Sequence, residues 1–238
     1  VIAHDVFMAV PAALVVHAAG VNLHEADTAL DEPPGLVAAG GDLSTERLIA
    51  AYRRGIFPWY SPGQPILWWS PDPREVLYPK EFRRSRSLAK RERNAGLEVR
   101  WSSAFAAVLE ACAAPRDSDG GGTWITAEMH EAYCALHAAG VAQSVETWRE
   151  GQLVGGLYGV RLGGVFFGES MFSRETDASK IALSALVRAA PELGIQLIDC
   201  QIYTDHSASF GAVEIQREAF ELRLRVALGG APTCVWPG

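Results

Sequence analysis

The chain has 238 residues, 49% hydrophobic and 21% charged, a composition that predicts a globular protein with a full core. Its formal charge is −7, so the chain as a whole is not expected to bind polyanions. The four cysteines are far apart and form no CxxC pair, which argues against a disulfide framework or a zinc site and predicts reduced thiols. The apolar start lacks a basic region and contains Pro11, so neither a signal peptide nor a membrane span is predicted. We therefore expect a cytoplasmic protein.

The first third of the chain predicts a helix and then a rigid aromatic segment. Ser44 is expected to cap a helix that ends at Gly55, with Leu43 and Leu48 at the staple positions. The segment 55–74 holds five prolines and three tryptophans. Prolines at this density fix the backbone, so the tryptophan rings either form stacking platforms for bases or fill a junction between domains. Both interpretations stay open at this point.

A basic run follows at 80–93, which carries seven of the 21 basic residues of the chain. Such a run is usually a solvated face of a helix. Here the basic charge is concentrated in an otherwise acidic protein, directly after the aromatic segment. This placement favours contact with the phosphates of a nucleic acid.

Two helices are expected in the middle of the chain. The first spans 104–113 and is capped by Ser102 or Ser103. A polar, glycine-rich loop leads to the second, which Thr126 caps and which extends to about Ala139.

The C-terminal half predicts a mixed sheet of order β-β-β-α-β. Turns at Glu150-Gly151 and Gly163-Gly164 make the first three strands an antiparallel meander. A helix over 177–190 then crosses to a fourth strand, so the last connection creates a parallel pair. The expected strands are 141–148, 152–160, 165–171 and 195–198, and a further helix is expected over 217–228.

Two carboxylates beside buried strands indicate an active site. Glu169 interrupts the apolar strand that starts at Val165, and Asp199 directly follows Leu197-Ile198. A carboxylate against a buried strand must be paired, hydrogen-bonded or shifted in pKa, which is what active sites require. The alternative is a pair of carboxylates that face an edge or cap a helix.

Three neighbouring polar residues allow two interpretations each. His206 could assist catalysis or bridge a loop by a hydrogen bond, and Arg174 and Lys180 could contact a phosphate or simply solvate the helix start. The strand order is that of GNAT-type acetyltransferases, whose acyl-CoA-binding members carry a glycine-containing loop between strand and helix. Residues 171–180 contain no glycine, which argues strongly against acyl-CoA as the donor.

Six motifs together resemble the leucyl/phenylalanyl-tRNA–protein transferase family. They are RGIFPWYSPG (54–63), WWSPDPR (68–74), GTWIT (122–126), GESMFSR (168–174), ASK (178–180) and LIDCQ (197–201). The resemblance runs in order from about residue 35 to 216. It implies an α+β fold in which a small N-terminal domain, 1–76, helps to bind the aminoacyl-tRNA 3′ end and a GNAT-like catalytic domain, 77–238, has a mixed β-sheet.

The resemblance also implies an activity. Members of this family move leucine or phenylalanine, and methionine less well, from aminoacyl-tRNA to an N-terminal Arg or Lys of a protein. The acceptor is thereby marked for degradation by the bacterial N-degron pathway. No metal or organic cofactor is implied, and we expect a monomer that does not bind membranes.

Site residues follow from the match of motifs. Trp59 and Trp124 match the tryptophans that hold the terminal adenosine. Asp199 and Gln201 match a pair that activates the acceptor amine, and Glu169 matches a further active-site carboxylate. The apolar pocket for the transferred side chain falls on or near Leu157, Phe166, Met171, Leu183 and Ile198. A leucine stands at 157 where a relative has methionine, which bears on the preference among the three amino acids.

The chemistry fits this interpretation. The donor is an activated ester, so most of the rate gain can come from positioning an unprotonated amine at the carbonyl. A nearby hydrogen-bond acceptor could assist deprotonation of that amine, a role assigned as a hypothesis to Asp199 acting through Gln201. The tRNA is expected to bind through its phosphates to Lys80, Arg83, Arg84, Arg86, Lys90 and Arg91. The alternatives are a GNAT-type transferase with another acyl donor and a non-catalytic module that binds aminoacyl-tRNA.

Overall fold

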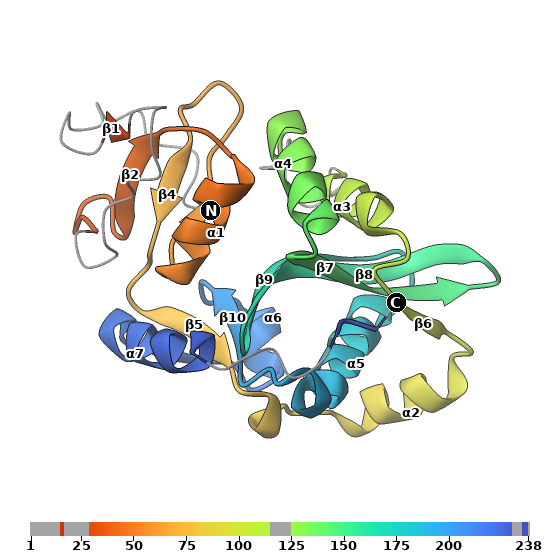
Figure 1. Cartoon of the computed structure of the whole chain (residues 1–238). Coiled ribbons are helices and arrows are strands. Elements are labelled where there is room, and N and C mark those ends of the chain that lie inside the picture. Colours follow the sequence, from red (N-terminus) through yellow and green to blue (C-terminus); the bar gives the residue numbers. More distant parts are fainter. Residues whose placement is uncertain (1–14, 17–28, 115–124, 230–234, 238) are drawn as a thin grey trace.

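The computed structural model describes residues 15–16, 29–114, 125–229 and 235–237, and two β-sheets organise them (Figure 1). The smaller sheet has the strand order β1-β2-β4-β3, and helix α1 packs near β3. The bounds are β1 Val15–Val16, β2 Leu36–Gly40, α1 Thr45–Arg53, β3 Phe57–Pro58 and β4 Leu67–Trp69. This part of the chain is predominantly apolar inside, and Trp68 is fully buried in it.

The larger sheet has seven strands in the order β11-β5-β10-β9-β8-β7-β6. Strands β7, β8 and β9 form an antiparallel meander, and β10 pairs parallel to β9. The predicted β-β-β-α-β order and mixed sheet are therefore confirmed. The bounds are β5 Arg74–Leu77, β6 Glu98–Trp101, β7 Ala142–Arg149, β8 Gln152–Leu162, β9 Val165–Ser173, β10 Leu197–Gln201 and β11 Val213–Ile215.

Helices cover both faces of the larger sheet (Figure 1). Helix α5, Ala178–Leu193, lies on one face, and α3, Phe105–Ala113, and α4, Ala127–Ala138, lie on the other. Because side chains alternate along a strand, Leu157 packs toward α5 while its neighbour Tyr158 packs toward α3 and α4. The remaining helices are η3 Pro79–Glu81, α2 Arg86–Asn94, α6 Asp205–Ser209 and α7 Arg217–Leu228. No helix in the described residues has the length and hydropathy to cross a bilayer.

The domain boundary expected after residue 76 falls inside β5. All of β5 belongs to the larger sheet, in which it pairs with β10 and β11, whereas β4 belongs to the smaller sheet. The change from one sheet to the other therefore lies between Trp69 and Arg74.

Ser44 is the N-cap residue of α1, as expected, although its side chain makes no cap bond. The expected cap of α3 by Ser102 or Ser103 is wrong, because the N-cap residue of α3 is Ala104, which has no side-chain cap bond. Instead, the buried carboxylate of Glu146 on β7 accepts the backbone N–H groups of Ser103 and Ala104. A distant carboxylate thus binds the backbone where the chain enters the helix, and a negative charge is favourable at this end of a helix. The cap by Thr126 is confirmed, with its hydroxyl accepting the Met129 N–H at 3.2 Å.

A wedge opens between β9 and β10 where their parallel pairing ends. The two strands pair only as far as Asp199 opposite Phe167. Beyond that point β9 contains a bulge, because Tyr158 pairs with Ser170 while Gly159 pairs with Gly168. The extra residue is Glu169, and a bulge re-aims the side chain that it carries. Gly159 is required opposite it, since a Cβ there would lie 2.1 Å from the Phe167 carbonyl oxygen.

Candidate active site

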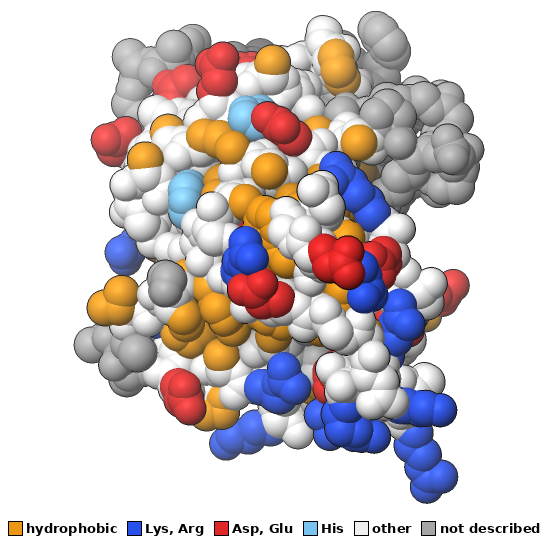
Figure 2. Space-filling view, turned by 90° about the vertical axis from the view of Figure 1, so that its right-hand side faces the viewer, with side chains coloured by type: hydrophobic (Ala, Val, Ile, Leu, Met, Phe, Trp, Pro, Cys, Tyr) orange, Lys and Arg blue, Asp and Glu red, His pale blue; other side chains and the backbone are white. Residues whose placement is uncertain are grey.

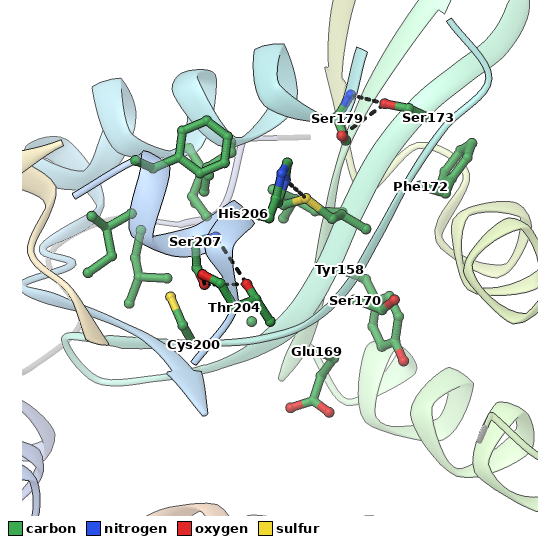
Figure 3. A pocket seen from close by; sticks show the side chains of 18 of the residues that line it. Tyr158, Glu169, Ser170, Phe172, Ser173, Ser179, Cys200, Thr204, His206 and Ser207 are labelled. Carbon is green, nitrogen blue, oxygen red and sulfur yellow. Dashed lines mark hydrogen bonds between the residues drawn. The ribbon is translucent and has the colours of Figure 1, made fainter. Parts of the chain in front are cut away.

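A cavity of about 700 Å³ occupies this wedge (Figure 3). All five apolar residues predicted for the transferred side chain line it, namely Leu157, Phe166, Met171, Leu183 and Ile198. Further apolar residues line the cavity, among them Leu77, Leu186 and Phe210, and these three were not predicted from the sequence. A wall of this kind favours a hydrocarbon side chain, because burial removes apolar surface from water.

A second cavity of about 190 Å³ lies beside the first. Trp59, Gln201 and Ile202 are among the residues that line it. Four residues line both cavities: Gly168, Glu169, Cys200 and Thr204. Glu169 is the only carboxylate among the four, so it lies where the apolar cavity meets the space beside Trp59.

Glu169 is bound by neutral hydrogen-bond donors from three elements. The Tyr52 hydroxyl on α1 donates to its Oε1 at 2.8 Å, and the Tyr133 hydroxyl on α4 donates to its Oε2 at 3.1 Å. The Gln201 amide on β10 donates to Oε1 at 3.0 Å. The two tyrosine hydroxyls are also hydrogen-bonded to each other. The site thus joins the smaller sheet's helix α1 to the larger sheet.

The environment of Glu169 raises its pKa to about 7. Burial is the main cause, and the hydrogen bonds from Tyr52 and Tyr133 oppose it by lowering the pKa. The nearby charge of Asp199 raises the pKa further, and that of Arg74 lowers it. A carboxyl group with a pKa near 7 can both accept and release a proton at neutral pH.

Asp199 lies in a different environment, although it is only one strand away. Its carboxylate is fully buried, and the Arg74 guanidinium donates to both of its oxygens at 2.8 and 2.7 Å. The rings of Phe57 and Phe220 lie 4.9 and 4.6 Å from that guanidinium. The backbone N–H of Gln201 donates to the same carboxylate at 2.9 Å.

This geometry favours a positioning role for Asp199 over the expected base role, because a guanidinium already balances its charge. Gln201 has a positive φ of 67°, which is unusual for a residue with a side chain. The Asp199 hydrogen bond to its backbone helps to hold that conformation. The amide of Gln201 is thereby directed to Glu169. The base role of Asp199 stays a prediction.

The three tryptophans of the 55–74 segment differ in burial, which bears on whether each ring is free to stack on a base or fills the core. Trp68 and Trp69 are buried on β4 and belong to the hydrophobic core. Trp59 is partly exposed, lies edge-on to Trp69 with ring centroids 6.2 Å apart, and lines the smaller cavity. Trp124, its expected partner, lies outside the described residues.

The basic run forms η3 and α2, and basic side chains gather at the lower end of the molecule in Figure 2. Helix α2 is capped by the Ser85 hydroxyl. Arg84 pairs with Glu92 at 3.1 Å, and Arg91 approaches Glu175 at 4.0 Å. The other four predicted tRNA-binding residues are exposed: Lys80, Arg83, Arg86 and Lys90.

The remaining polar residues near the site have structural partners. His206 Nε2 lies 3.2 Å from the Met171 sulfur at the edge of the apolar cavity. Lys180 pairs with Asp177 at 2.9 Å. Arg174 donates to the Leu153 carbonyl and lines the larger cavity.

Three residues of the site were not singled out from the sequence: Tyr52, Tyr133 and Arg74. Tyr52 and Tyr133 lie on helices among apolar residues, and only the fold brings their hydroxyls to Glu169. Arg74 is the first residue of β5, a short buried strand. Its place shortly before the apolar pair Val76-Leu77 was the one local signal that the arginine could be buried and paired. Within the described residues, no cluster of His, Cys, Asp and Glu could hold a metal ion.

Comparisons with known proteins show the family of this chain. The model for "Leucyl/phenylalanyl-tRNA protein transferase" matches residues 76–225, and that for the N-terminal domain of the same family matches residues 41–72. The leucyl/phenylalanyl-tRNA–protein transferase of Nitrosomonas europaea is 62% identical over 83% of this chain and 84% of its own length. That of Stutzerimonas stutzeri is 57% identical over 88% of this chain and 92% of its own.

Among solved structures, a GCN5-related N-acetyltransferase from Kribbella flavida has a TM-score of 0.39 and 12% identity, covering 70% of this chain and 59% of its own. The two family models and the two relatives cover both the smaller sheet's segment and the larger sheet. The chain therefore belongs to the leucyl/phenylalanyl-tRNA–protein transferase family and is a transferase enzyme.

Proposed function

We propose that the chain moves leucine or phenylalanine, and methionine less well, from aminoacyl-tRNA to the N-terminal Arg or Lys of an acceptor protein. The transfer forms a peptide bond and marks the acceptor for the N-degron pathway. The observation that carries this proposal is the apolar cavity, which meets the Trp59 cavity at Glu169. An aminoacyl ester has this division, with a side chain on one side of the carbonyl and an adenosine on the other.

In this arrangement the side chain of the transferred amino acid enters the apolar cavity. The terminal adenosine lies against Trp59, with Trp124 as its expected second wall. The ester carbonyl then lies near Glu169 and Gln201, where the acceptor amine must arrive. Because the ester is already activated, positioning of the amine supplies much of the rate gain.

The acceptor carries two positive charges, on its amine and on its Arg or Lys side chain. Among the residues that line the smaller cavity, Glu169 is charged and none is basic. This polarity favours a cationic acceptor. The predicted contacts to the phosphates of the tRNA acceptor arm are basic residues of the run 80–93, namely Lys80, Arg83, Arg84, Arg86, Lys90 and Arg91. We propose that the enzyme acts in the cytoplasm as a monomer and needs no cofactor.

A transfer assay with radiolabelled leucyl-tRNA tests this function. We expect leucine to be transferred to a peptide that begins with Arg, and not to the same peptide beginning with Met or with an acetylated Arg. Aspartyl-tRNA is the matched donor control, because burying a carboxylate against the apolar wall of the cavity costs free energy.

Two results would contradict the proposal. Transfer from acetyl-CoA in place of leucyl-tRNA would identify a GNAT-type transferase with another donor. Tight binding of leucyl-tRNA without any turnover on the Arg peptide would identify a non-catalytic binding module.

A further inference from the structure

The contacts of Glu169 with the two tyrosines form a closed ring of hydrogen bonds. Glu169 Oε1 meets the Tyr52 hydroxyl, Tyr52 meets Tyr133, and Tyr133 meets Glu169 Oε2. The ring has three contacts, whereas the two hydroxyls supply two protons. With Glu169 ionised, one of the contacts therefore lacks a proton. With Glu169 protonated, each of the three contacts has one.

The tyrosines are the right groups for this ring because they stay protonated. Burial, and then the charge of Glu169, raise the pKa of Tyr52 and Tyr133 well above its usual range. Both hydroxyls are neutral at physiological pH and can donate or accept a hydrogen bond. The proton that completes the ring must therefore be carried by Glu169.

The other titratable groups near Glu169 do not substitute for it. Tyr158 on β8 is fully buried, and its hydroxyl has no hydrogen-bond partner among the described residues. Asp199 and Arg74 influence Glu169 by their charge but are bonded to each other. Of these groups, only Glu169 lines both cavities.

We propose that Glu169 takes the proton from the acceptor amine during transfer, and that Tyr52 and Tyr133 are positioning residues that prepare it to do so. This inference rests on the proposed function and names the proton acceptor for it. Tyr52 belongs to α1 and Tyr133 to α4, so the proton acceptor is assembled only when both helices pack at the β9 bulge.

The steps balance as follows. The neutral amine attacks the ester carbonyl carbon, an N–C bond forms, and the carbonyl π electrons move to oxygen. Glu169 takes a proton from the nitrogen and the ring then holds three protons. As the intermediate collapses, the bond from carbon to the ribose oxygen breaks, and Glu169 returns the proton to that oxygen. Glu169 ends ionised and the tRNA leaves with a free hydroxyl.

The two tyrosines have different roles in this scheme. Tyr52 donates to Oε1 in both states of the carboxyl group, because the Gln201 amide also donates to Oε1 and leaves Oε2 as the oxygen that takes the proton. Tyr133 donates to the ionised carboxylate and accepts from the protonated carboxyl group. Tyr52 stabilises mainly the ionised form, because a hydrogen bond to a charged oxygen is stronger than one to a neutral oxygen. Tyr133 stabilises both forms, since it also accepts a hydrogen bond from the protonated carboxyl group.

The pH dependence of kcat/KM for an Arg-initiated peptide tests the proposal. The rate should rise with pH as Glu169 and the acceptor amine lose their protons. In Tyr52→Phe the apparent pKa that Glu169 contributes to this profile should rise by about one unit, because a hydrogen bond to the ionised form is lost. In Tyr133→Phe this apparent pKa should rise by less, because contacts to both forms of the carboxyl group are lost, and kcat should fall. The amine contributes equally in every variant, so differences report on the enzyme.

Tyr60→Phe is the matched control, because its hydroxyl donates to a different carboxylate, Glu128, at 3.2 Å. Its profile should match that of the wild type. If Tyr52→Phe and Tyr133→Phe are folded, as judged by thermal melting, and both keep the wild-type profile, the proposal is overturned. Tyr133→Phe serves alone if Tyr52→Phe does not fold. A wild-type enzyme that transfers no leucine would instead refute the proposed function.

Discussion

Two buried carboxylates on neighbouring strands face opposite kinds of partner. Asp199 on β10 is bonded to the guanidinium of Arg74, which balances its charge. Glu169 on the β9 bulge is bonded to two phenols and an amide, and these donors carry no charge. The first arrangement suits a fixed support and the second suits a group whose charge changes. Burial alone does not define the role of a carboxylate, because the charge of its partners decides what it can do.

The support role of Asp199 predicts the largest effect on stability. Asp199→Asn should lower the free energy of unfolding by about 3–5 kcal/mol, because Arg74 would be left as an uncompensated buried charge. Urea denaturation measures this loss. Glu98→Gln breaks an exposed pair with Arg100 and should leave the denaturation midpoint essentially unchanged. An Asp199→Asn variant as stable as the wild type would contradict the comparison.

The changeable charge of Glu169 predicts a pH-dependent stability. The pKa of Glu169 in the folded protein is about 7, against an ordinary value of 4.5. As the pH rises, the unfolded state therefore loses this proton before the folded state does. This contribution is complete below pH 4.5 and is lost as the pH rises to about 7. Relative to Glu169→Gln, the wild type should therefore lose about 3 kcal/mol of unfolding free energy across this window.

Denaturation with urea at a series of pH values checks this difference. The two proteins should be most alike at the acid end, and the Gln variant should be the more stable at pH 8. A constant difference at all pH values would show that Glu169 does not change its protonation in the folded state.

A third comparison sets three arginines of the basic run against three exposed arginines elsewhere on the surface. Replacing Arg83, Arg84 and Arg86 by Gln should weaken leucyl-tRNA binding roughly tenfold at moderate salt and flatten its salt dependence. The matched control replaces Arg53, Arg223 and Arg225, which are exposed on α1 and α7, by Gln. Filter binding at several salt concentrations measures both. Equal salt slopes for the two triple variants would exclude the basic run at 80–93 as the tRNA contact.

The smallest effect is expected within the apolar cavity. Leu157→Met nearly conserves volume, so the fold should lose less than about 1.5 kcal/mol. The ratio of leucine to methionine transfer should change by about threefold or less, because the wall stays apolar. Competition between leucyl-tRNA and methionyl-tRNA gives this ratio. A change of a hundredfold would mean that position 157 selects the side chain by shape.

Local signals predicted much of the fold. The turn at Glu150-Gly151 has positive φ at both residues, as a tight hairpin requires, and the Thr126 cap forms as expected. The meander and the crossover helix follow from such signals together with apolar periodicity. The entry of β5 beside β10 was not predicted, because its partner strand lies more than 100 residues away along the chain.

The site was predicted only where local sequence patterns mark its residues. Four of the five apolar residues and both carboxylates stand on strands, and Leu183 stands on helix α5. The patterns of these elements are visible in the sequence, and the seven residues do come together at the larger cavity. The hydroxyls of Tyr52 and Tyr133 reach Glu169 across separations of 117 and 36 residues, which no local pattern records. Arg74 pairs with Asp199 across 125 residues. The sequence thus marked both carboxylates but not the partners that distinguish them.

The most direct measurement is the single-turnover rate of leucine transfer by Glu169→Gln at saturating leucyl-tRNA and Arg-initiated peptide. Glutamine keeps the size of the side chain but cannot take a proton. The rate should fall by at least about a hundredfold, while the affinity for leucyl-tRNA stays within a factor of about three. A transfer rate within about threefold of the wild type would contradict the assignment of Glu169 as the proton acceptor.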